Sequence, residues 1–146
     1  MNNFNIFILI SILLFITIMG CKTTVIDDPP STDIQELTVY FSWPDIYQIC
    51  FDPNNPELIV SNIPADTLYF YVSVYDTLNG YDHGGGKVMN DGTGIIAYGS
   101  VPNYKGPCPG QSPYQYGIYE FTVNAYNSND EKIGTGMYSR RFPEET

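Results

Sequence analysis

The residues best suited to bind a ligand lie in two glycine- and proline-rich stretches in the second half of the chain. Asp76 precedes His83, the only histidine, and three glycines follow at positions 84 to 86. Glycines let backbone N–H groups approach a ligand closely, and an imidazole adds a donor and, near neutral pH, a charge. Asp76 can orient His83 or accept from a ligand amine, and the hydroxyls of Tyr81 and Tyr104 add donors. This set predicts a modest site for a small anion.

A purely structural explanation of the same residues stays open. In it Asp76 caps a loop, His83 is solvated and the glycines only permit a turn. The chain has no His-Glu-x-x-His, no Gly-x-Ser-x-Gly and no Walker loop, since Val88 follows Gly86-Lys87. An acidic set that includes Asp82 and Asp91 has the spacing of no known metal loop. We therefore expect no enzyme activity, no metal and no cofactor.

The elements that position these residues have a period of two. Alternating apolar residues occur in residues 37–42, 68–75 and 118–126, and a last strand is expected near 137–142. The expected inward residues are Leu37, Val39, Phe41, Leu68, Phe70, Val72, Val74, Tyr119, Phe121, Val123 and Ala125. No long segment has a period of 3.6. The fold class is therefore all-β, and a β-sandwich is expected.

Two connections are too long for simple turns. Residues 76–94 hold six glycines, and residues 102–117 hold four prolines and three glycines. Structureless loops of this length in a small domain are usually functional or disordered, so we expect the ligand site between them.

The amino-terminal segment is typical of an export signal. An apolar run from Ile6 to Met19 is shorter than the roughly 20 residues that span a bilayer, and it fits the apolar part of a signal peptide. It ends in Ile18-Met19-Gly20-Cys21, which resembles the lipobox of bacterial lipoproteins, although no Lys or Arg precedes the run. We expect a signal peptide over residues 1–20, a lipid on Cys21, a tether over 21–36 and a domain over 37–146. The protein would then be anchored to a membrane of the bacterial cell envelope, outside the cytoplasm.

Charge and cysteine content narrow the range of partners. The net charge of −10 repels nucleic acid, so we expect no nucleic-acid partner.

With Cys21 taken by lipid, Cys50 and Cys108 are the only pair that can form a disulfide, which an exported domain can keep. Closing that loop would contribute roughly 4 kcal/mol. Two buried free thiols are the alternative.

Four stretches, in this order along the chain, resemble the phosphatidylethanolamine-binding protein family in its bacterial branch. They are Cys50-Phe-Asp-Pro-Asn-Asn-Pro-Glu-Leu58, Ile63-Pro-Ala-Asp-Thr67 with the strand ending at Asp76, Asp82-His-Gly-Gly-Gly86, and Tyr104-Lys-Gly-Pro-Cys-Pro109 with Tyr119-Glu-Phe-Thr-Val-Asn-Ala125. The resemblance implies a Greek-key β-sandwich of two antiparallel sheets with a small anion pocket. Of the family's pocket residues, the resemblance places Asp76 and His83 in this chain. Together with the glycines and donors of the two loops, the expected ligand-binding residues are Asp76, His83, Gly84, Gly85, Tyr104, Gly106 and Pro107.

The chain departs from the family pattern at two pocket positions. The family's second aspartate falls on Leu78, and its second histidine falls on Gly117. The first functional hypothesis is a membrane-anchored module that binds a phosphorylethanolamine-like head group. The alternative is a protein-interaction or inhibitory module on the same scaffold with a degenerate pocket. The two missing residues, the acidic charge and the tyrosines Tyr114 and Tyr116 favour this alternative.

Overall fold

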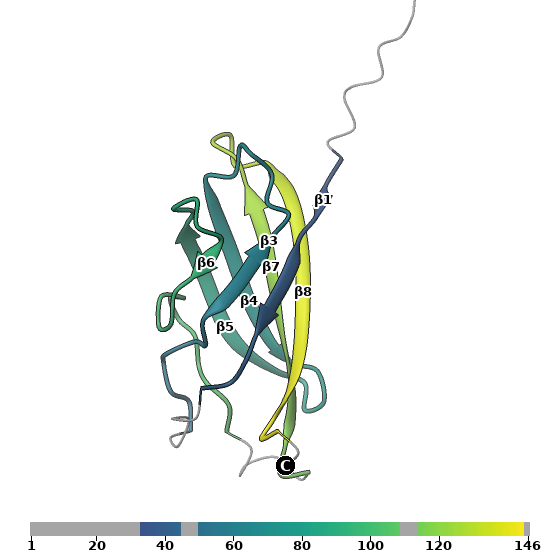
Figure 1. The fold of residues 1–146 in the computed structure, drawn as a ribbon. Helices are drawn as coiled ribbons and strands as arrows, with labels where there is room; N and C mark the ends of the chain where they lie inside the picture. The colour runs from purple at the N-terminus through teal and green to yellow at the C-terminus, as the bar shows by residue number, and fades with distance from the viewer. Residues whose placement is uncertain (1–32, 45–49, 109–113, 145–146) are drawn as a thin grey trace, which may run out of the picture. The chain divides into compact units, whose positions relative to one another are not determined.

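The chain forms two β-sheets, the smaller packed over one face of the larger (Figure 1). The computed structural model describes residues 33–44, 50–108 and 114–144, which contain eight strands and no helix. The strands are β1 (Gln35–Glu36), β2 (Thr38–Phe41), β3 (Leu58–Ser61), β4 (Tyr69–Asp76), β5 (Tyr81–Met89), β6 (Ile95–Ile96), β7 (Gly117–Tyr126) and β8 (Lys132–Phe142). The five-stranded sheet has the order β1-β8-β7-β4-β5, and the three-stranded sheet has the order β2-β3-β6. The prediction of an all-β fold is confirmed.

Strand pairing is antiparallel throughout both sheets except between β1 and β8, which run parallel. The segment 35–41 therefore belongs to both sheets, first as β1 and then as β2. Between the two, the Leu37 N–H donates to the Thr135 carbonyl at 2.8 Å. A side chain at Gly136 would place its Cβ 2.3 Å from the Leu37 carbonyl oxygen, so only glycine permits this approach. Strand β1 takes up the last two residues of the segment predicted as a tether.

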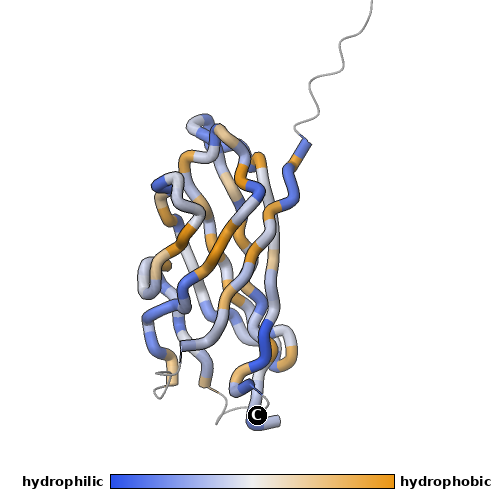
Figure 2. Tube along the Cα trace, viewed as in Figure 1, coloured by the Kyte–Doolittle hydropathy of each residue, from blue (hydrophilic) through white to orange (hydrophobic). Residues whose placement is uncertain are grey.

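The core lies between the two sheets, and its residues come from the alternating patterns (Figure 2). All the predicted inward residues except Leu68 are at most 4% exposed. Leu68 is 43% exposed, and that prediction is wrong because the strand begins one residue later, at Tyr69. The ring of Tyr69, on the outer face, is buried instead by stacking on Tyr126 and by the ammonium of Lys87.

The long loop predicted over residues 76–94 is wrong, because it contains strand β5 between two turns, and β6 begins directly after it. The glycines at 84 to 86 lie inside β5, where missing side chains hide the alternation that marks a strand. The last strand is also longer than predicted and begins at Lys132. Strand β3 was not predicted either. In the described residues, no helix is long and apolar enough to cross a membrane.

Candidate functional site

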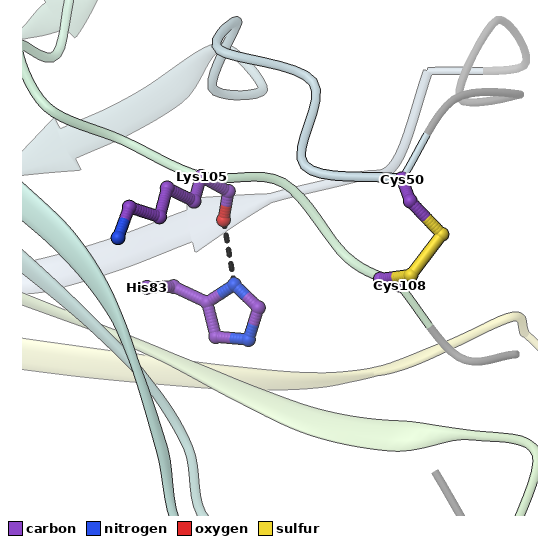
Figure 3. The surroundings of a disulfide bond; sticks show 4 residues. All are labelled: Cys50, His83, Lys105 and Cys108. Carbon is purple, nitrogen blue, oxygen red and sulfur yellow. Dashed lines mark hydrogen bonds between the residues drawn. A yellow bond between two sulfur atoms is a disulfide. The ribbon is translucent and has the colours of Figure 1, made fainter. Parts of the chain in front are cut away.

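A disulfide ties the segment before β3 to the stretch that precedes β7 (Figure 3). Cys50 and Cys108 are joined across 58 residues of sequence, with their Cα atoms 4.4 Å apart. Beside the bridge, the Gly106 N–H donates to the Asp52 carbonyl at 2.7 Å. The predicted pairing is confirmed, and such a bond is typical of an oxidising compartment outside the cytoplasm. Cys21 and the predicted signal peptide lie outside the described residues.

His83 lies on β5 and is only 3% exposed, so the alternative of a solvated imidazole is wrong. Its Nδ1 lies 2.6 Å from the Lys105 carbonyl oxygen (Figure 3). Because a carbonyl oxygen can only accept, Nδ1 carries the hydrogen and donates it. The Lys105 N–H donates back to the His83 carbonyl at 2.8 Å. Tyr81 and Tyr119 pack against the imidazole in edge-to-face geometry, each with ring centroids 4.9 Å away.

Burial lowers the pKa of His83 below its usual value of 6.5, against the opposing influence of the Lys105 carbonyl and of Asp76. The folded protein therefore binds this proton less tightly than the unfolded chain does. The stabilisation that comes from a neutral His83 is fully present above the pKa of this imidazole in the unfolded chain. It is lost as the pH falls through the lower pKa of His83 in the folded protein.

We predict that the free energy of unfolding decreases between about pH 7.5 and pH 5 because His83 must take up a proton. In His83→Asn the amide can still donate to the Lys105 carbonyl but does not titrate in this range. Denaturant unfolding at several pH values would measure the slope for both proteins. Equal slopes would show that His83 does not cause the pH dependence.

Asp76 ends β4 and is 3% exposed, and its carboxylate is occupied by the protein itself. Oδ1 accepts from the backbone N–H groups of Leu78, Asn79 and Ile118 at 3.0, 3.1 and 3.2 Å. Oδ2 accepts from the Asn79 side-chain amide at 2.7 Å. Asp76 thus caps the turn between β4 and β5 and fixes the start of β7, which agrees with the structural explanation of this residue.

Gly117, where the resemblance has a second histidine, is buried against Asp76. A Cβ at this position would lie 2.4 Å from Asp76 Oδ2 and 2.7 Å from the Tyr119 ring. The space that a pocket histidine would need is therefore filled by two other side chains. A histidine fits here only if both of them move.

The predicted glycines contact the protein's own chain. Cβ atoms at Gly84 and Gly85 would lie 2.1 Å from the Asn103 carbonyl oxygen and 2.0 Å from the Val72 carbonyl oxygen. Both residues have positive φ angles, 79° and 138°. They bring β5 close to its neighbours, and their role is this close packing.

The remaining predicted residues belong to the interior. Tyr104 is 3% exposed, and its ring packs 5.8 Å from that of Phe121 in the core. Gly106 and Pro107 are also buried. The structure thus brings the two predicted stretches together around His83, but it joins them as packed, hydrogen-bonded chain. Among the described residues, no three His, Cys, Asp or Glu side chains gather to hold a metal ion.

Two exposed features were not predicted as sites. A shallow hollow of about 250 Å³ lies at the small sheet and includes Tyr40, Glu57, Ile59 and Tyr98 in its lining. On the outer face of the large sheet, Tyr71 and Tyr75 are each 46% exposed. The tyrosines that alternate with apolar residues in residues 69–75 are the sequence signal for this second feature.

These features define an all-β domain of two sheets, closed by a disulfide beside a buried histidine. No family model and no curated protein matches the sequence.

Proposed function

We propose that this protein is a membrane-anchored binding module, exposed outside the cytoplasm, on a scaffold like that of phosphatidylethanolamine-binding proteins. It contacts a partner through its surface and does not hold a small phosphate-bearing ligand. The observation that carries this proposal is the occupation of the Asp76 carboxylate by the chain's own donors, with Gly117 packed against it. The module binds and catalyses no reaction.

The proposed scaffold is supported by the way in which the four resembling stretches converge. Cys108 of the Gly-Pro-Cys-Pro stretch is bonded to Cys50 of the first stretch. Lys105 of the same stretch is hydrogen-bonded in both directions to His83. Asp76 and Tyr119, from the second and fourth stretches, lie on paired positions of β4 and β7. A Greek-key arrangement of this kind is part of the proposal.

A phosphate group at this site would have to compete with interactions that are already made. The Asp76 carboxylate is nine-tenths or more buried, and the donors that surround it are satisfied by it. A neutral His83 with a lowered pKa carries no charge to attract an anion at neutral pH. Opening the site would leave buried donors unsatisfied, which costs about 1–3 kcal/mol for each group.

The proposal is tested by titrating the full chain, in detergent micelles, with phosphorylethanolamine while the His83 ring resonances are followed by NMR. Because His83 is the only histidine, its signals need no assignment. We expect them to stay unmoved at millimolar ligand. A ligand-dependent shift that is lost in Asp76→Asn would overturn the proposal and restore the anion pocket.

A second variant tests whether the site is closed or only lacks its histidine. We predict that Gly117→His loses about 1–3 kcal/mol of stability from overpacking against Asp76 and Tyr119, without gaining phosphorylethanolamine binding. Thr77→His is the matched control, because it adds an exposed histidine beside the same turn and should change stability by less than about 0.5 kcal/mol. If Gly117→His is as stable as the parent and binds the ligand, the site is an open pocket.

A further inference from the structure

We infer that the outer face of the five-stranded sheet binds an uncharged oligosaccharide, whose sugar rings stack on Tyr71 and Tyr75. This inference rests on the proposed function and names the surface and the partner. Both tyrosines point outward from β4, which lies between β5 and β7. They are four residues apart on one strand, so their Cα atoms are about 13 Å apart along it. A short oligosaccharide has the length to reach both rings.

The two rings stand on either side of a low strip that runs from β5 across β4 to β7, and the exposed Met137 of β8, which is paired with Thr122, bounds the strip at that end. Ser73 lies midway between them, with Gly85 of β5 and Thr122 of β7 as its cross-strand partners. A Cβ at Gly85 would meet the Val72 carbonyl oxygen at 2.0 Å, so a larger residue cannot raise the floor at this position. Between the two tyrosine rings, the strip therefore presents the hydroxyls of Ser73 and Thr122 and the exposed backbone of Gly85.

Tyr71 and Tyr75 differ from the other tyrosines of this face in what they contact. Tyr69 stacks on Tyr126 with ring centroids 5.0 Å apart, and the Lys87 ammonium lies 3.6 Å over the Tyr69 ring. This stacked pair stabilises the sheet in the usual cross-strand manner. In the described residues, Tyr71 and Tyr75 make no contact with another ring, and their hydroxyls donate no hydrogen bond. Their exposed rings are available to a partner.

The charges around the strip suit a neutral partner. Tyr71 is paired across the sheet with Lys87 and Asn124, and Tyr75 is paired with Asp82 and Glu120. The outward positions beside the two rings thus carry one cation and two anions, within a chain of net charge −10. A polyanion would meet repulsion from the whole chain, and a polycation has no concentrated acidic patch here. A polyol fits, because its hydroxyls can donate to carboxylates and accept from amides and hydroxyls.

The chemistry of the strip also favours a sugar over an apolar protein anchor. A protein hot spot fills a desolvated pocket with a large side chain, whereas this floor is Gly, Ser and Thr. A pyranose ring presents C–H groups on its faces and hydroxyls at its edge. It can therefore lie on a tyrosine ring, whose face is negative, while its hydroxyls reach the neighbouring polar side chains.

The test measures binding of hexasaccharides of glucose and of N-acetylglucosamine to the full chain, in a detergent without a sugar head group, by isothermal titration calorimetry. We expect at least one of them to bind, with an affinity that does not change between low and high salt because the ligand is uncharged. Tyr71→Ala and Tyr75→Ala should each weaken binding about tenfold, and Tyr71→Phe should retain it. Tyr98→Ala, which removes a comparably exposed tyrosine elsewhere, is the control and should bind like the parent.

Thermal unfolding of each variant shows whether a loss of binding reflects loss of the fold, and exposed sites should shift it little. If no hexasaccharide binds, or if Tyr98→Ala weakens binding as much as Tyr71→Ala, the inference is overturned. The same samples, titrated with phosphorylethanolamine, separate the two proposals. If the His83 ring resonances do not move with phosphorylethanolamine and no sugar binds, only the oligosaccharide inference fails. If the His83 resonances shift with phosphorylethanolamine, the proposed function fails.

Discussion

Replacing Phe121 with alanine is expected to lower the free energy of unfolding by about 4 kcal/mol, within the usual range for a buried phenylalanine. Phe121 lies at the centre of β7 and is fully buried. Its ring centroid is 4.5 Å from that of Phe41 on β2 and 5.8 Å from that of Tyr104. The ring thus joins the two sheets and the segment before the disulfide, so its removal leaves a cavity that no single movement can fill.

Denaturant unfolding of the chain from residue 22 would measure this loss, because the eight described strands and the disulfide lie within that fragment. Met137→Ala is the matched control, since it removes a large apolar side chain that is 61% exposed on the neighbouring strand. We expect it to change stability by less than about 0.5 kcal/mol. If the two variants lose similar amounts, the interface between the sheets is not the main core.

Loss of the disulfide is expected to destabilise the domain by about 4 kcal/mol, from the chain entropy that a loop across 58 residues regains in the unfolded state. The bridge also holds the stretch that hydrogen-bonds to His83, since Lys105 lies three residues before Cys108. We therefore expect the double variant Cys50→Ser, Cys108→Ser to expose His83 as well as to unfold at lower denaturant.

Unfolding with and without a reductant gives the measurement. The parent should lose stability when the reductant is present. The double serine variant has no bridge to reduce, so its stability should be the same with and without the reductant. Parent stability that is the same in both conditions, with a reduced bridge verified by mass spectrometry, would show that the tertiary contacts alone hold this end of the sandwich. Proton exchange at the Lys105 amide, which is bonded to the His83 carbonyl, reports the local loosening.

The sequence predicts the strands whose side chains alternate over several residues. Val39 and Phe41 in β2, and Phe121 and Val123 in β7, are inward as expected, because one buried face imposes a period of two. Strand β6 has two residues, too few for any period to appear. Strand β5 carries three glycines in succession, and residues without side chains show no alternation.

The sequence predicted which residues of the candidate site lie together better than it predicted what those residues do. The spacing of Asp76, His83 and the Gly-Pro-Cys-Pro stretch indicated residues that do meet in the fold. Which partner each polar atom takes depends on the path of the backbone, and a sequence does not give that path. Asp76 accepts from donors one turn ahead and from Ile118, 42 residues away. Only the assembled turn and strand show that the carboxylate is fully used.

The crossing of residues 35–41 from one sheet to the other has a mechanical consequence. Any pull on the segment that precedes the domain is applied first to β1, which is held to β8 by two paired positions. The next residue, Leu37, is fixed by its hydrogen bond to Thr135 and by its close approach to Gly136. A pulling force can therefore detach only the short strand β1 before it reaches Leu37. From Leu37 the force is shared between the two sheets. The interior of the sandwich therefore bears little of the load.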